Sequence, residues 1–102
     1  MSTIKVTVQS IHFTADQKLT DFIDERCRKL AKMSENIIGA ESTLKLDNDS
    51  KLENKVVEIK LLIPGNDLFA KKNARTFEDA VDKTVEALRR QLKKRKEKVW
   101  GV

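Results

Sequence analysis

The sequence is poor in the residues that build disulfides, metal clusters and phosphate-binding loops. Its 102 residues include one cysteine, one histidine and three glycines. A single cysteine, Cys27, cannot form an internal disulfide and excludes a Cys-cluster metal site. The glycines, at positions 39, 65 and 101, are too scattered for a glycine-rich phosphate loop. These absences indicate a reducing compartment, and we expect no cofactor.

Long apolar runs are absent as well. None approaches the roughly 20 residues that a membrane-spanning helix needs. The first residues, Met1-Ser2-Thr3-Ile4-Lys5, lack the basic start, apolar core and cleavage site of a signal peptide. We therefore expect a cytoplasmic protein with no membrane partner.

The few residues suited to catalysis form no constellation. His12 has no Ser, Cys or carboxylate placed in sequence as a nucleophile–base partner, so we interpret it as a surface histidine. Cys27 lies on an apolar helix face and is interpreted as a core residue. Asp47, Asp49 and Glu53 lack the central glycine and final acid of a calcium loop, which favours a hairpin turn. The sequence thus predicts neither an enzyme nor a small-molecule substrate.

Positive charge, in contrast, is concentrated at one end of the chain. The net charge is +5, and residues 89–98 hold seven Lys or Arg against one acid. The rest of the chain is close to neutral. Such a concentrated patch points to a polyanionic partner, because evenly spread charge would only confer solubility.

Apolar and polar residues alternate near residues 4–8, 42–46 and 57–63, which predicts three strands. The repeat at 68–73 is weaker, but its place between a Pro-Gly turn and the next helix cap favours a fourth strand. Turn-forming residues follow the second strand at 47–50 and the third at 64–67. We therefore expect two tight turns between successive antiparallel strands.

Two amphipathic segments predict helices. The segment Thr14-Ala15-Asp16-Gln17 has the spacing of a capping box, which predicts a helix with Thr14 at its N-cap that runs to about Met33 or Ser34. Thr76 caps the second helix. Its buried stripe runs from Phe77 to Leu92, and the next position on the stripe is Arg95, which predicts that the helix has left the core there.

The element order β-α-β-β-β-α predicts an α+β fold. We expect one domain spanning residues 1–102, a two-layer sandwich with a four-stranded sheet and both helices on one sheet face. A seven-residue strand is roughly 23 Å long, and a helix from residue 77 to 98 is about 33 Å long. Roughly two turns of the last helix should therefore project past the sheet.

The projecting helix end is the candidate binding site. Helical spacing places Arg89, Lys93 and Lys96 on one flank and Arg90, Lys94 and Lys98 farther round. Arginine and lysine in such an array suit phosphate oxygens. The alternative is a solvated helix end that complements its own dipole, although one or two cations are enough for that role.

Two further pairs of lysines could extend this candidate phosphate-binding surface only if they lie on the same face of the protein. They are the pairs Lys29 with Lys32 and Lys71 with Lys72, each otherwise ordinary surface charge. Trp100 either stacks on a base or packs back on the domain.

The last helix reads Ala80-Val81-Asp82 and then Leu88-Arg89-Arg90-Gln91-Leu92-Lys93-Lys94-Arg95-Lys96-Glu97-Lys98. This resembles the ribosome hibernation promoting factors, the ribosome-associated translation inhibitors. Two earlier segments are similar to that family as well: Phe13-Thr14 through Arg28-Lys29-Leu30-x-Lys32, and Gly65-x-x-Leu68-x-Ala70. The likeness covers nearly the whole chain.

The resemblance implies a fold akin to the double-stranded RNA-binding domain with an extra strand. It implies binding to small-subunit rRNA where messenger and transfer RNA lie, which would block translation in stationary phase or stress. Family positions match Lys29, Lys32, Arg90, Lys94, Lys96 and Lys98, and the helical spacing adds Arg89 and Lys93. The chain resembles the short form, for which ribosome dimerisation would require a second factor.

Two alternatives stay open from the residues alone. One is a different RNA-binding module, such as a ribosomal or assembly protein. The other is a protein-interaction domain whose basic helix docks on an acidic partner.

Overall fold

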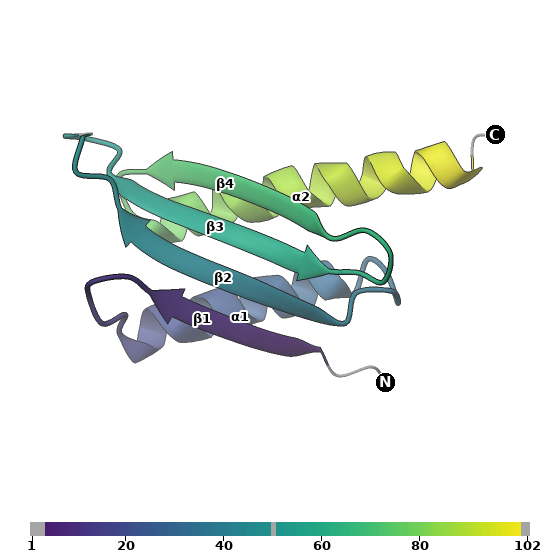
Figure 1. Ribbon diagram of the computed structural model, residues 1–102, viewed down its shortest axis with the longest axis horizontal. Coiled ribbons are helices and arrows are strands. Elements are labelled where there is room, and N and C mark those ends of the chain that lie inside the picture. The colour runs from purple at the N-terminus through teal and green to yellow at the C-terminus, as the bar shows by residue number, and fades with distance from the viewer. Residues whose placement is uncertain (1–3, 50, 101–102) are drawn as a thin grey trace.

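The computed structural model describes residues 4–49 and 51–100, the last five of them by their backbone alone. Two helices lie on one face of a four-stranded sheet (Figure 1). The elements in chain order are β1 (Lys5–Ser10), α1 (Gln17–Ala31), β2 (Gly39–Leu46), β3 (Lys55–Leu62), β4 (Leu68–Ala74) and α2 (Phe77–Trp100). This arrangement confirms the predicted α+β sandwich.

The strands lie side by side in sequence order. β1 pairs with β2 in parallel, whereas β2 with β3 and β3 with β4 are antiparallel. A parallel pair needs a crossover connection, which α1 supplies between β1 and β2. The β3–β4 connection, residues 63–67, is tight, as predicted, whereas the longer segment 47–54 joins β2 to β3. In the β3–β4 connection Gly65 has φ 91°, a backbone conformation that glycine adopts without the steric cost of a side chain.

The core lies between the sheet and the helices. The predicted apolar stripes face it, with Ile23, Leu44, Ile59 and Leu88 among its fully buried side chains. Thr84 is also buried there, and its hydroxyl donates to the Ala80 carbonyl at 2.7 Å. Within the described part of the chain, no element covers the opposite sheet face (Figure 1). We call this opposite side the open sheet face.

The predicted N-cap of the first helix is wrong by two residues. The cap is Asp16, whose carboxylate accepts the Leu19 backbone N–H at 2.8 Å, so Thr14 lies outside the helix. The reason is tertiary: the Phe13 ring stacks on the Phe77 ring of α2 with 5.1 Å between centroids. The chain between Phe13 and Asp16 therefore connects this stack to the helix without being helical itself.

The C-terminal end of α1 differs slightly from the prediction, whereas the N-cap of α2 agrees with it. α1 ends at Ala31, slightly before the predicted Met33 or Ser34. The cap of α2 is confirmed, since the Asp79 N–H donates to Thr76 Oγ1 at 3.1 Å. The last turns of α2 project beyond the sheet, as predicted (Figure 1).

Candidate nucleic-acid interface

The topology brings the C-terminal ends of both helices to the same end of the sheet. β1 and β4 run in the same direction, because one parallel and two antiparallel pairings separate them. Each helix then returns antiparallel to the strand before it, so α1 and α2 run parallel (Figure 1). The negative ends of both helix dipoles, where cations are favoured, therefore lie together.

One contact between the helices shows which of their residues lie at the same level. Arg26 Nε of α1 donates to Asp82 Oδ1 of α2 at 3.0 Å. Both helices rise by the same distance per residue, so Lys29 and Lys32 lie about level with residues 85–88 of α2. The two α1 lysines thus lie immediately before the point where the basic run of α2 begins.

Six of the eight predicted site residues have described side chains, and all six are exposed. They are Lys29, Lys32, Arg89, Arg90, Lys93 and Lys94. We call this group the basic end. The side chains of Lys96, Lys98 and Trp100 lie outside the described residues, although the backbone of α2 is helical through Trp100.

Acidic neighbours only partly compensate the basic end. Lys29 lies 3.8 Å from Glu25, and Glu86 lies 3.8 Å from Arg89 and 3.6 Å from Arg90. The Arg90 side chain is 79% exposed. Ion pairs this exposed are worth at most about 1 kcal/mol, so a phosphate can replace the carboxylate at small cost.

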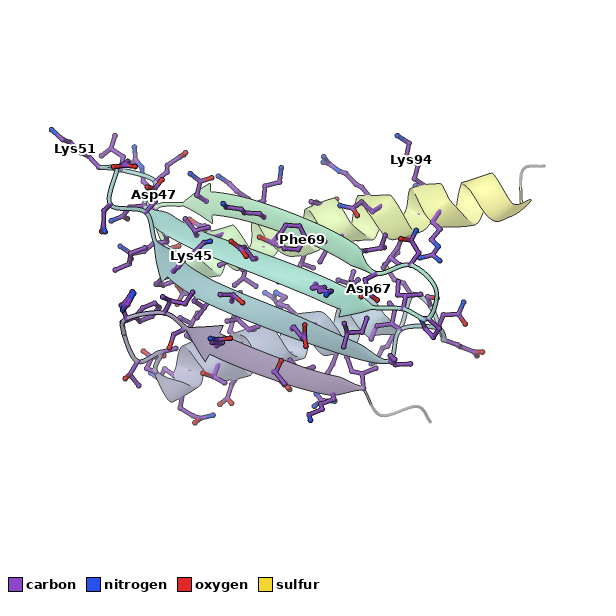
Figure 2. The ribbon with its side chains drawn as sticks, in the orientation of Figure 1. Lys45, Asp47, Lys51, Asp67, Phe69 and Lys94 are labelled. Atoms are coloured by element: carbon purple, nitrogen blue, oxygen red, sulfur yellow. The ribbon has the colours of Figure 1, made fainter. Side chains whose placement is uncertain are left out.

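The cations cover two flanks of α2. Arg89 and Lys93 follow Asp82 by seven and eleven residues, so they share the flank that faces α1. Arg90 and Lys94 lie on the flank turned away from α1. Figure 2 shows Lys94 pointing away from the body of the protein, beyond β4. The two flanks agree with the predicted helical wheel.

Arg95 lies outside the apolar core, as predicted, but it still contacts the domain. Arg95 is half-buried, and its Nη1 donates to the Asn66 carbonyl in the β3–β4 turn at 3.0 Å. One turn earlier, Gln91 Nε2 donates to the Phe69 carbonyl at 3.1 Å. Among the side chains that the structure describes, Leu92 is the last buried apolar residue of α2, and Arg95 attaches the helix to the turn.

The structure separates the two neighbouring lysines of β4. Lys71 points to the open sheet face, where it lies 3.9 Å from Glu58. Lys72 points to the helix side and lines a hollow together with Arg90. Only Lys72 therefore shares a surface with the basic end.

Lys83 lines the same hollow and was missed by the sequence analysis. It precedes Arg90 by seven residues, a helical spacing that would have identified it.

The groups that remain do not support catalysis. Cys27 is fully buried, and loss of hydration raises the pKa of its thiol to about 11, which keeps it protonated and unreactive. His12 is exposed. Among the described residues, no cluster of His, Cys, Asp or Glu is suited to hold a metal ion. The described helices include none that is long and apolar enough to cross a membrane.

Known proteins share this fold. The N-terminal domain of Protein Y from Thermus thermophilus superposes with a TM-score of 0.76 at 16% identity, covering 90% of this chain and 98% of that one. A ribosomal subunit interface protein from Coxiella burnetii gives a TM-score of 0.77 at 18% identity, covering 91% and 98%. At these identities the likeness establishes the fold.

Sequence comparison adds the family. A ribosome hibernation promoting factor of Pseudomonas putida is 30% identical over 95 residues, covering 93% of this chain and 89% of that protein. Residues 6–100 match a family described as sigma 54 modulation protein / S30EA ribosomal protein. This agrees with the resemblance identified from sequence and with a role other than catalysis. The chain therefore belongs to the sigma 54 modulation protein / S30EA ribosomal protein family.

Proposed function

We propose that this protein is a cytoplasmic ribosome hibernation factor that binds rRNA of the small subunit in the channel for messenger and transfer RNA. In this account the folded domain, residues 1–102, inhibits translation by occupying that channel in stationary phase or stress. No bond is made or broken. Where ribosomes are paired, a second factor takes part.

The observation that carries the proposal is the gathering of cations from two helices at one end of the molecule. Lys29 of α1 and Lys32 at its C-cap lie level with the start of the basic run of α2. Phosphate contacts from lysine and arginine supply affinity and orientation in RNA complexes, without base recognition. We assign rRNA binding to Lys29, Lys32, Arg89, Arg90, Lys93, Lys94, Lys96 and Lys98.

Two further findings support this reading. The Pseudomonas putida relative bears the name ribosome hibernation promoting factor, and the Coxiella burnetii protein is described as a ribosomal subunit interface protein. In addition, the first turn of α2 is acidic, with Glu78 and Asp79. A polyanion is repelled from that end of the helix layer and attracted to the basic end.

Sedimentation of purified small subunits tests the proposal. We compare the wild type with Arg90→Ala/Lys94→Ala and with a matched control, Lys60→Ala/Lys71→Ala, which removes two lysines from the open sheet face. We expect the wild type and the control to co-sediment, the Arg90/Lys94 variant to bind more weakly, and messenger RNA to displace the wild type. Binding that messenger RNA does not displace would place the protein outside the channel, and equal loss in both variants would reject the assigned surface.

A further inference from the structure

A shallow hollow lies where α2 meets β4, and it extends across the outer surface of α2 to Asp82. Its volume is ≈ 390 Å³. Lys72 of β4 lines it together with five residues of α2: Asp82, Lys83, Glu86, Ala87 and Arg90. Ala87 is the smallest of the six side chains and leaves room between the charged ones.

The carboxylates in this hollow already have cationic partners. Asp82 accepts the 3.0 Å hydrogen bond from Arg26, and Glu86 lies between two arginines of α2 at 3.8 and 3.6 Å. Lys72 and Lys83, in contrast, form no ion pair with any residue that the structure describes. The excess charge of the hollow is therefore positive and resides on these two lysines.

The hollow is continuous with the basic end. Lys83, Arg90 and Lys94 are spaced by seven and four residues, so they form one stripe along the outer flank of α2. Lys72 adds a cation from the edge strand beside this stripe. A polyanion bound at the basic end and extending past Arg90 would reach Lys83 and Lys72.

We propose that Lys72, Lys83 and Arg90 bind a backbone phosphate of RNA in this hollow. The inference deepens the proposed function, on which it rests, and extends the RNA footprint around α2 to the edge of the sheet. Arginine supplies a planar pair of donors for phosphate oxygens, and each lysine supplies a mobile point charge. The ligand is the phosphodiester, so the site contributes affinity that is independent of base sequence.

The test is the salt dependence of binding to small subunits. Each phosphate contact that is lost flattens the slope of log K against log salt by about 0.7–0.9. We expect Lys72→Ala/Lys83→Ala to flatten the slope by roughly 0.7–0.9, because the contact with one phosphate is lost. The matched control is Lys60→Ala/Lys71→Ala, which removes the same charge from the open sheet face and should leave the slope unchanged. All four lysines are exposed, and a thermal melt verifies that each variant is folded.

The outcomes separate this inference from the proposed function. If the wild type binds with a steep slope and Lys72→Ala/Lys83→Ala keeps it, the hollow does not bind phosphate while the proposed function stands. A wild type that does not bind small subunits overturns both. Free inorganic phosphate is titrated separately, without ribosomes and at constant ionic strength. Saturable phosphate binding that depends on Lys72 and Lys83, together with an unchanged salt slope in the Lys72→Ala/Lys83→Ala variant, would assign the hollow to a free anion and reject the RNA ligand.

Discussion

Arg26 and Asp82 join the two helices through an ion pair in which Arg26 Nε donates to Asp82 Oδ1 at 3.0 Å. The same guanidinium lies over the Phe22 ring, 4.4 Å from its centroid. The pair therefore fixes α1 against α2 one turn before Lys29, and it helps to hold the cations of both helices on one surface.

Substitution of Arg26 by alanine removes the ion pair and the cation–π contact together. We expect the free energy of unfolding to fall by about 1–2 kcal/mol, and by about 0.2–1 kcal/mol for Asp82→Ala, which removes the ion pair alone. Urea denaturation of both variants and the double variant gives the coupling energy. A coupling of zero would show that the pair does not hold the helices together.

The position of the N-cap of α1 is directly testable. Asp16→Ala removes the acceptor of the Leu19 N–H and should lower the free energy of unfolding by about 0.5–2 kcal/mol. Thr14→Ala is the control and should have little effect, because Thr14 lies outside the helix. Equilibrium denaturation separates the two sites, and a larger loss at Thr14 would restore the capping box predicted from sequence.

His12 adopts a left-handed backbone conformation, with φ 67°. A side chain at this φ is disfavoured by contact with the following carbonyl, whereas glycine has no such cost. We expect His12→Gly to raise the free energy of unfolding by up to about 1 kcal/mol, part of the gain being offset by the greater freedom of glycine in the unfolded chain. A His12→Ala variant controls for loss of the imidazole. If the His12→Gly variant were no more stable than the His12→Ala variant, the left-handed backbone at residue 12 would carry no strain.

The Cys27 thiol should make stability depend on pH in the alkaline range. Burial raises its pKa from 9.0 to about 11, so the folded protein retains a proton that the unfolded chain releases first. The contribution of the protonated thiol to the free energy of unfolding is fully present below pH 9 and is lost as the pH rises toward 11. The difference in unfolding free energy between the wild type and Cys27→Ala should therefore shrink over that range. A constant difference would indicate that the thiol titrates normally.

Regular patterns in the sequence were sufficient to predict the fold. The period-two segments correspond to β1, β2 and β3, and the segment between the Pro-Gly turn and the cap at Thr76 corresponds to β4. The two apolar stripes form the buried faces of α1 and α2. The N-cap was wrong because Thr14 and Asp16 are both good caps. The choice between them depends on the stack of Phe13 on Phe77, a contact between residues 64 positions apart.

The candidate site was predictable only in part, because some of its residues depend on contacts between distant parts of the chain. Clustered charge identified Arg89 to Lys94, but the neighbours Lys71 and Lys72 could not be assigned to a face until the register of β4 was known. The role of Arg95 depends on the Asn66 carbonyl, 29 residues earlier, and no local pattern reveals that bond. Long-range contacts thus determine the N-cap of α1, the faces of Lys71 and Lys72, and the position of Arg95.

The most direct test of the central claim is the affinity of the wild type for purified small subunits across a range of salt concentrations. With about four to six phosphates neutralised, log K against log salt should fall with a slope of roughly −3 to −5. Arg90→Ala/Lys94→Ala should flatten that slope by about 1.4–1.8, since two contacts are lost. A flat wild-type response, or an unchanged slope in this variant, would contradict the claim that the basic end binds rRNA phosphates.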